Sequence, residues 1–208
     1  MGGLSAGDKY TGEYRDGKPH GQGTMLFADG AKHQGEFAFG VPHGHGIYYF
    51  EDAEYIGEFR MGRKCGHGMI RFADGSTYVG EFNDDRREGY GVLSFPGGRC
   101  EGTWRDGLQN GHGSYFFEDS EYVGQFKNGR REGRGTVTFP DGRRYTGEFA
   151  RDKWNGRGTA VYADGSTYAG QFADSRRNGR GTLTFPDGTV KHGMWQADVL
   201  VREGQAEE

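Results

Sequence analysis

Polar and apolar residues alternate in two short segments that recur along the chain. In residues 145–149, which read YTGEF, the tyrosine, glycine and phenylalanine fall on one side of an extended backbone. In residues 156–162, GRGTAVY, both glycines and the tyrosine share one side, and Arg157, Thr159 and Val161 share the other. A few polar residues separate the two segments, so the pattern predicts a β-hairpin. Glycine recurs too often for a helix, and no apolar stripe with a helical period is present.

This hairpin pattern repeats every 22 or 23 residues. Residues 145–167, shifted by 23 positions in either direction, match 122–144 and 168–190. A fixed period of this length indicates a repeat architecture. We predict an N-terminal cap at 1–9, and a partial ninth repeat with a C-terminal tail at 191–208. Between them we predict eight units with the bounds 10–32, 33–54, 55–77, 78–99, 100–121, 122–144, 145–167 and 168–190.

Each unit reads Y-x-G-x-[FW], a short turn, then G-x-G, an aromatic residue and D-G, with single substitutions in some copies. This pattern resembles the MORN repeat (membrane occupation and recognition nexus), and the resemblance covers about nine-tenths of the chain. Proteins of this kind are associated with cytoskeletal, ciliary and membrane-contact assemblies. Some of them bind an extended peptide or a helix along an aromatic groove, so the resemblance implies a binding scaffold.

The glycines share a side with the aromatic residues, which predicts how the hairpins pack. Glycine inside a strand marks a place where another group approaches closely. We therefore expect each ring to lie over the glycines of a neighbouring strand. One hairpin cannot bury its rings alone, so stability has to come from stacking on its neighbours. The expected fold is all-β: an elongated, single-layer antiparallel sheet of tandem hairpins, a rod of solenoid type.

Composition excludes several other classes of protein. The chain has 41 Gly in 208 residues and only 33% hydrophobic residues, and no apolar run approaches the roughly 18 residues of a membrane span. We expect no signal peptide, because the N-terminus has no charged segment followed by an apolar one. The two cysteines, Cys65 and Cys100, occupy non-equivalent repeat positions, which favours free thiols in a reducing compartment. The expected location is the cytoplasm, with cytoskeletal or ciliary association implied by the resemblance.

Several residue types that often carry chemistry have a structural explanation here. A glutamate recurs at the fourth position of five units, but glutamine, threonine or methionine replaces it in others, so we expect it to hydrogen-bond to backbone. Histidines at equivalent positions of successive repeats would lie about 10 Å apart, too far to share a metal ion. No glycine-rich segment has the spacing of a phosphate-binding loop. We expect a non-enzyme without cofactor or metal.

Charge is distributed unevenly. Residues 1–121 hold 12 Lys and Arg against 19 Asp and Glu, whereas residues 122–190 hold 12 against 7. The basic residues of the second segment fall at hairpin turns and on adjacent strands. They could contact anionic phospholipids such as phosphoinositides, face an acidic protein partner, keep the sheet soluble, or pair with the acidic half of a second copy. Nucleic acid is not expected, since the net charge is −4. The predicted anionic contacts are Arg130, Arg131, Arg134, Lys153, Arg157, Arg176, Arg177 and Arg180.

Our functional prediction is a repeat scaffold that binds an extended or helical protein segment, with acidic residues, along a concave groove of rings and glycines. The alternative is a peripheral membrane adaptor that binds anionic phospholipids through the turn arginines. Val199, Leu200 and Val201 are expected to fold back over the last hairpin or to form a homodimer contact through the C-terminal repeats. The predicted partner-binding rings are Tyr122, Phe126, Phe139, Tyr145, Phe149, Tyr162, Tyr168, Phe172 and Phe185.

Overall fold

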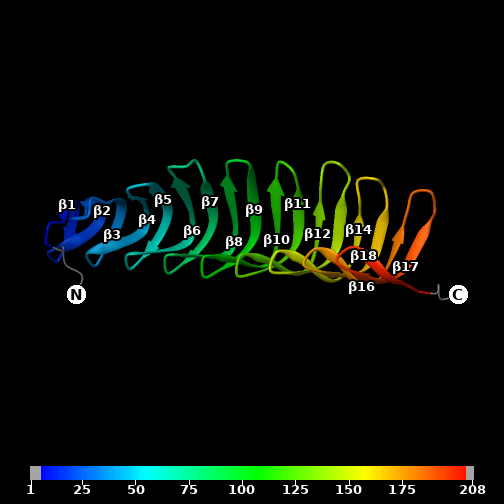
Figure 1. The fold of residues 1–208 in the computed structure, drawn as a ribbon. Helices are drawn as coiled ribbons and strands as arrows, with labels where there is room; N and C mark the ends of the chain where they lie inside the picture. Colours follow the sequence, from blue (N-terminus) through cyan, green and yellow to red (C-terminus); the bar gives the residue numbers. More distant parts are fainter. Residues whose placement is uncertain (1–5, 205–208) are drawn as a thin grey trace. The chain divides into compact units, whose positions relative to one another are not determined.

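The computed structural model describes residues 6–204, and every regular element in this range is a β-strand (Figure 1). The predicted cap at 1–9 and tail at 191–208 lie partly outside the described residues. The chain divides into two units, residues 1–108 and 109–208. Among the described residues, no helix is long and apolar enough to cross a membrane.

Nine complete strands lie in the described part of unit 1, residues 6–108. They are β1 (Lys9–Arg15), β2 (Lys18–Leu26), β3 (Lys32–Ala38), β4 (Val41–Tyr49), β5 (Ala53–Arg60), β6 (Arg63–Phe72), β7 (Thr77–Asn83), β8 (Arg86–Phe95) and β9 (Gly98–Arg105). The strands of unit 2 are β10 (Leu108–Phe117), β11 (Glu121–Lys127), β12 (Arg130–Thr138), β13 (Arg144–Ala150), β14 (Lys153–Val161), β15 (Thr167–Ala173), β16 (Arg176–Thr184), β17 (Val190–Gln196) and β18 (Val199–Glu203).

Within each unit, every strand pairs antiparallel with the strands before and after it in the chain. The predicted all-β fold of tandem antiparallel hairpins is therefore confirmed. From β11 to β17 the register places glycine opposite glycine, so that Gly147 of β13 pairs with Gly158 of β14, and Gly158 with Gly170 of β15. Strands β1 to β9 of unit 1 follow the same rule. The glycines thus form a continuous row across the strands.

A tyrosine ring covers this row in most hairpins. The hydroxyl of Tyr145 donates a hydrogen bond to the carbonyl oxygen of Glu148 at 2.8 Å. A Cβ atom at Gly147 would collide with this hydroxyl, and a Cβ at Gly158 would collide with both the hydroxyl and the ring. The expected packing of rings on bare backbone is confirmed, and it explains why both positions are glycine. We call this side of the sheet the aromatic face, and the other side the opposite face.

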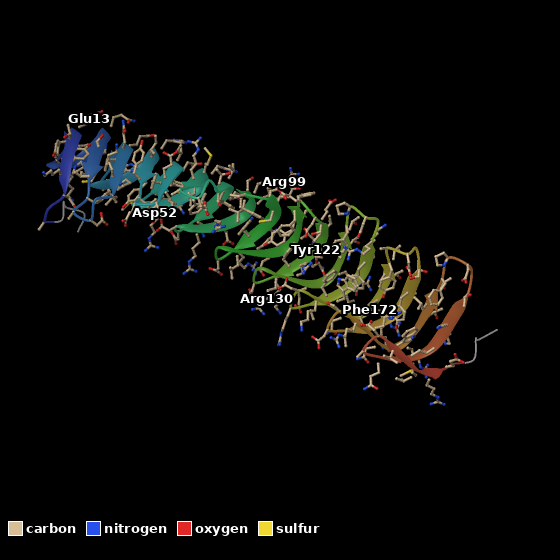
Figure 2. All side chains as sticks on the ribbon, turned by 45° about the horizontal axis from the view of Figure 1, so that its top comes forward. Glu13, Asp52, Arg99, Tyr122, Arg130 and Phe172 are labelled. Atoms are coloured by element: carbon tan, nitrogen blue, oxygen red, sulfur yellow. The ribbon has the colours of Figure 1, made fainter. Side chains whose placement is uncertain are left out.

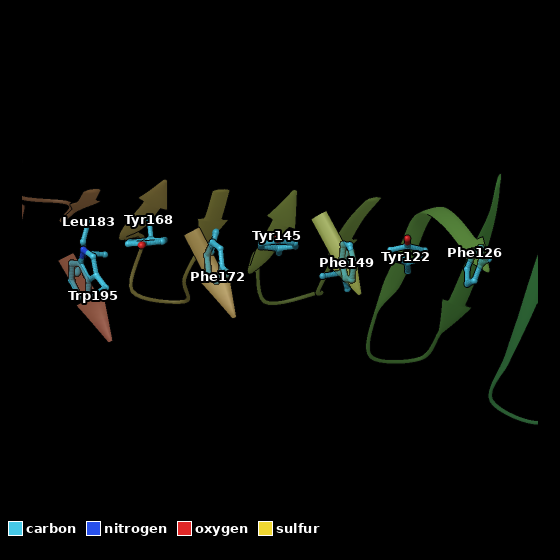
Figure 3. Packing of buried hydrophobic residues seen from close by; sticks show 10 residues of the cluster. Tyr122, Phe126, Tyr145, Phe149, Tyr168, Phe172, Leu183 and Trp195 are labelled. Atoms are coloured by element: carbon cyan, nitrogen blue, oxygen red, sulfur yellow. The ribbon is translucent and has the colours of Figure 1, made fainter. Parts of the chain in front are cut away.

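Rings of successive repeats interlock along the aromatic face. Tyr145 meets Phe149 of its own hairpin at 5.2 Å between ring centroids and Phe172 of the next hairpin at 5.1 Å, both nearly perpendicular. Figure 3 shows the resulting alternation of tyrosine and phenylalanine rings in unit 2. Such edge-to-face pairs contribute roughly 0.5–1.5 kcal/mol beyond the area they bury. Each hairpin is therefore completed by a ring from the following one.

A β-bulge lies beside each tyrosine, and an acidic or amide side chain fills it. In β5, Glu58 follows the last glycine pair, and its carboxylate accepts the backbone N–H of His67 at 3.0 Å. Glutamates 13, 36 and 81 accept the corresponding N–H groups at 2.9–3.0 Å, which confirms the expected backbone hydrogen bonding. Gly66, at φ 56°, has to be glycine because a Cβ there would meet the Glu58 carboxylate.

Two repeats depart from the tyrosine pattern: the fifth has the buried Cys100 at this position, and the second has a histidine. His33 occupies the tyrosine position of the second repeat and is fully buried, with its ring 4.7 Å from the Phe59 ring and 5.0 Å from the Phe37 ring. Neither of its ring nitrogens has a hydrogen-bond partner among the described residues. Burial lowers the pKa of His33 to about 4, from an ordinary value of 6.5. The imidazole is therefore neutral in the folded protein at neutral pH.

His33 should make the stability of the chain depend on pH. Because its pKa is lower in the folded state than in the unfolded state, protonation favours unfolding. The stability it contributes is complete above about pH 6.5 and is lost as the pH falls towards about 4, by about 3 kcal/mol in total. We expect His33→Tyr to remove this part of the pH dependence and to raise stability, by restoring the hydroxyl. Denaturant unfolding at several pH values would measure both effects.

The exposed His67 provides the matched control, since His67→Gln removes one histidine without changing the buried position. An identical pH dependence in the wild type and in His33→Tyr would show that other groups cause it.

Candidate functional site

The predicted partner-binding rings divide into two groups. Six of them, the tyrosines 122, 145 and 168 and the phenylalanines 126, 149 and 172, form the core and are each no more than 4% exposed. Figure 2 shows Tyr122 and Phe172 lying against the ribbon. The other three, Phe139, Tyr162 and Phe185, follow the second strand of their hairpins and are half-buried. Contact of the six core rings with a partner stays a prediction, and their burial leaves almost no area for it.

The rings are buried because a further side chain covers each tyrosine from above. Trp154 stacks flat on Tyr145, with 4.3 Å between ring centroids and 4° between the planes. The guanidinium of Arg131 lies 5.6 Å from the centroid of the Tyr122 ring. Arg177 occupies the same position over Tyr168, at 5.9 Å. In each of these hairpins, one large side chain thus shields the tyrosine ring of the single-layer sheet from water.

The covering arginines are also fixed by the next hairpin. Asp152, in the turn that follows β13, accepts the backbone N–H of Arg131 at 2.9 Å and lies 3.5 Å from its Nε. Its own N–H donates to the carbonyl oxygen of Arg131 at 3.1 Å. Asp198 forms the same contacts with Arg177, 21 residues earlier in the chain. We call this arrangement the turn latch.

The turn latch depends on backbone conformation. Arg151 and Asp152, the two turn residues, have φ of 50° and 70°, as in the type I′ turns that match the twist of a hairpin. Lys153, at the same turn, pairs with Asp174 of the next turn at 2.8 Å. Three of the predicted anionic contacts, Arg131, Lys153 and Arg177, therefore already form ion pairs with aspartates of the same chain. Arg130 and Arg176 are exposed, and Arg130 points away from the sheet (Figure 2).

The remaining three predicted anionic contacts come together on the opposite face of unit 2. Arg134 of β12, Arg157 of β14 and Arg180 of β16 line one groove of about 770 Å³. Each guanidinium is exposed, and none has an ion-pair partner among the described residues. We call this the basic groove. Its lining residues are Arg134, Gly135, Thr136, Thr146, Gly147, Glu148, Arg157, Gly158, Thr159, Gly170, Gln171 and Arg180.

Threonine hydroxyls form the floor of the basic groove. Thr136, Thr146 and Thr159 lie across from one another on β12, β13 and β14, and the hydroxyl oxygens of Thr136 and Thr146 are 3.1 Å apart. The bulge side chains at its edge are partly neutral, because Gln125 and Gln171 replace glutamate. Their amide oxygens still accept the N–H groups of Arg134 and Arg180 at 2.9 Å. The structural hydrogen bond is kept without a carboxylate at these two positions, whereas the hairpin between them retains Glu148, which lies across from Arg134 and lines the groove.

A family model for the MORN repeat matches eight consecutive stretches of the chain: residues 10–32, 33–52, 55–77, 78–98, 100–121, 122–143, 145–167 and 168–190. The chain belongs to the MORN-repeat family. The resemblance identified from the repeat pattern is thereby confirmed.

Other comparisons of this MORN-repeat chain are less informative. No curated protein matches it. The TCP10 domain of Danio rerio CPAP, in a mutant form, is similar with a TM-score of 0.46 and 17% identity, over 92% of this chain and 91% of that one. The TCP domain of Drosophila melanogaster SAS-4 (dCPAP), solved with a proline-rich motif of Ana2 (dSTIL), gives a TM-score of 0.31 and 16% identity over 84% of each chain. Both similarities are too weak to carry a conclusion about partners.

The basic groove lies on the opposite face, whereas the sequence predicted partner binding along the aromatic face, where a smaller pocket is lined by Tyr122 and Arg131. Binding along the aromatic face stays a prediction. Sequence reasoning grouped the groove arginines with the turn arginines and overlooked the threonine floor. The signal was present, since strand alternation places Arg157 and Thr159 together and away from Gly158. Within residues 6–204, no cluster of three or more histidine, cysteine, aspartate or glutamate side chains could hold a metal ion.

The neighbouring residues Arg130 and Arg131 test the turn latch directly. We expect Arg131→Gln to lower the free energy of unfolding by about 1–2 kcal/mol, because it removes a cation–π contact and the charge-assisted bonds to Asp152. Arg130→Gln removes the same charge from an exposed site and should change stability by less than about 0.5 kcal/mol. Denaturant unfolding of both variants measures the difference, and equal effects would argue against the latch.

Proposed function

We propose that this MORN-repeat chain is a non-catalytic scaffold whose basic groove binds an acidic segment of a protein partner. The observation that carries the proposal is the contrast between two sets of basic residues. Arg131, Lys153 and Arg177 are engaged by aspartates of the next hairpin, whereas the three groove arginines have no ion-pair partner among the described residues. Unpaired guanidinium groups beside hydroxyl donors are suited to carboxylates.

The spacing of the groove arginines restricts the shape of the partner. They lie on alternate strands, so neighbouring arginines are separated by about 10 Å along the sheet. Acidic residues seven apart in a helix are about 10.5 Å apart, and acidic residues three apart in an extended segment of polyproline II type share one side and are about 9 Å apart. Both spacings match that of the groove arginines, so the partner segment can be either extended or helical, as predicted from the sequence. Half-buried Phe139, Tyr162 and Phe185 provide a second, smaller contact on the aromatic face.

The membrane alternative has less support. It relied on the arginines of the hairpin turns, and the turn latch already uses Arg131 and Arg177. Arg130 and Arg176 remain available for anionic phospholipids, each contributing about 1 kcal/mol near a charged surface. Two such contacts give weaker binding than a groove with three convergent arginines. We propose a cytoplasmic protein-binding scaffold, in one of the cytoskeletal, ciliary or membrane-contact assemblies that the family suggests, and we expect no nucleic-acid partner.

A matched pair of triple variants tests the proposal. The first replaces the groove arginines (Arg134→Gln, Arg157→Gln and Arg180→Gln), and the second replaces three exposed arginines elsewhere in unit 2 (Arg130→Gln, Arg144→Gln and Arg176→Gln). Both lose the same charge. Against a synthetic peptide with glutamate at every seventh position, the groove variant should bind at least about tenfold more weakly than the control variant. Peptides with glutamate at every third position test the extended form.

The same variants distinguish a lipid contact. If vesicles containing phosphatidylserine bind the wild type and the second variant loses that binding, the membrane alternative is correct. Equal peptide affinities for both variants would contradict the proposed groove. Binding should weaken as salt rises from about 0.05 M to 0.5 M, because the contacts are between exposed charges.

We also propose a homodimer through the C-terminal repeats. The apolar tail residues form β18, which pairs with β17, and Leu200 packs against the core, as the fold-back alternative predicted. Val199 and Val201 remain 62% and 56% exposed on this last strand. An exposed strand with apolar side chains favours pairing with another strand. Sedimentation should show a dimer that forms at higher concentration and is weakened by Val201→Lys; a monomer throughout would contradict this.

A further inference from the structure

Five apolar side chains form a continuous row on the opposite face of unit 1. They come from five successive strands, β4 to β8, and each lies directly across from the next. Val79 is 52% exposed, and the others are half-buried. Gln34 precedes the row on β3 and Glu101 follows it on β9, so both ends are polar. This apolar row consists of Ile47, Ile56, Met69, Val79 and Val92.

Folding does not require the row to be apolar, as unit 2 shows. On strands β11 to β16 of unit 2, four of the six residues at the same repeat positions are threonine, in the same register: Val123, Thr136, Thr146, Thr159, Ala169 and Thr182. Threonine has nearly the shape of valine and a similar preference for strands. Isoleucine, methionine and valine therefore expose apolar surface where a polar residue would serve the sheet equally well. A contiguous exposed apolar patch marks a contact surface.

Acidic residues line one border of the apolar row. Glu36, Glu58 and Glu81 lie there, each tied to a backbone N–H, and their neighbours on the next strand are His45, His67 and Tyr90. On the other border, Arg71 and Glu54 form an ion pair at 2.8 Å and cancel each other. In unit 2, by contrast, arginine takes the place of these neighbours and glutamine replaces two glutamates. The apolar row thus carries a negative border.

We infer that the apolar row docks an amphipathic helix of a protein partner, with lysine or arginine along one border of its apolar stripe. Side chains of the row follow one another every 4.8 Å or so, over about 19 Å. Successive apolar residues of an amphipathic helix are about 5.3 Å apart along the helix axis on average, whereas successive residues on one side of an extended segment are about 6.6 Å apart. The helical spacing is closer to that of the row. The glutamates are about 10 Å apart, which matches basic residues seven apart in a helix. This surface is independent of the basic groove.

The test converts the face of unit 1 into that of unit 2. The fourfold variant Ile47→Thr, Ile56→Thr, Val79→Thr and Val92→Thr replaces every residue of the apolar row except Met69, and unit 2 shows that threonine is compatible with these hairpins. The probe is a synthetic helical peptide of about 20 residues, with leucine on one stripe and lysine along one border. A second peptide has glutamate in place of lysine. The control variant, Thr136→Val with Thr159→Val, changes the same repeat positions in unit 2 by the reverse exchange.

We expect the fourfold variant to bind the lysine-bordered peptide roughly 100-fold more weakly than the wild type, with unchanged circular dichroism and melting. Val79→Thr alone, at the most exposed position, should weaken binding roughly fivefold, and it decides the question if the fourfold variant does not fold. The control variant should bind like the wild type, and the glutamate-bordered peptide should bind more weakly than the lysine-bordered one.

Three results would overturn the inference. Equal affinity of the wild type and Val79→Thr would show that the row makes no contact. Equal affinity for the two peptides would remove the role of the glutamate border. Binding of phosphatidylcholine or phosphatidylserine vesicles that Val79→Thr weakens, with no binding of either peptide, would identify a membrane surface as the occupant. The arginine variants of the basic groove should leave this binding unchanged, so the two surfaces are tested separately.

Discussion

A tyrosine ring lying flat on bare glycine backbone is the contact on which the hairpins depend. Tyr145 can reach the carbonyl of Glu148 only because Gly147 and Gly158 have no side chain. Three other rings pack against the Tyr145 ring: a phenylalanine of the same hairpin, a phenylalanine of the next hairpin, and Trp154, which stacks on its face. A single layer of sheet obtains a dry core in this way, without a second sheet or a helix to cover it. The glycines of this row follow from that requirement, whereas others, such as Gly66, are required by the bulge and its positive φ.

Because the core occupies only one face, the other face is free to vary. The bulge shows how this works: Glu58 and Gln125 accept the same backbone N–H, but only one of them is charged. The neighbouring residue is His67 beside Glu58 and Arg134 beside Gln125, and the hairpin forms in both cases. Units with the same backbone therefore present an acidic, apolar face in one half of the chain and a basic, hydroxyl-lined groove in the other.

The sequence was sufficient for the fold because its signals are local. The alternation in YTGEF and GRGTAVY determines which residues share a face, and the period determines how hairpins follow one another. The site was harder to predict. Arg131 and Arg134 are three residues apart and equally basic, yet Asp152, 21 residues later, engages only the first. Similarly, the sequence around Tyr145 does not indicate that Trp154 stacks on its ring, because this contact depends on how the hairpin bends at its bulge.

The turn latch has a direction, and that direction matters during synthesis. Each latch joins a residue to a turn 21 positions further along, never to an earlier one, so Arg131 is fixed only when Asp152 has been made. Proteins are synthesised from the N-terminus at roughly 5–20 residues per second. The newest hairpin on a ribosome therefore always carries an uncovered ring and an unlatched arginine, for a few seconds, until its successor emerges. Folding should advance by one repeat at a time behind the ribosome, with only the most recent unit exposed to aggregation or to chaperones.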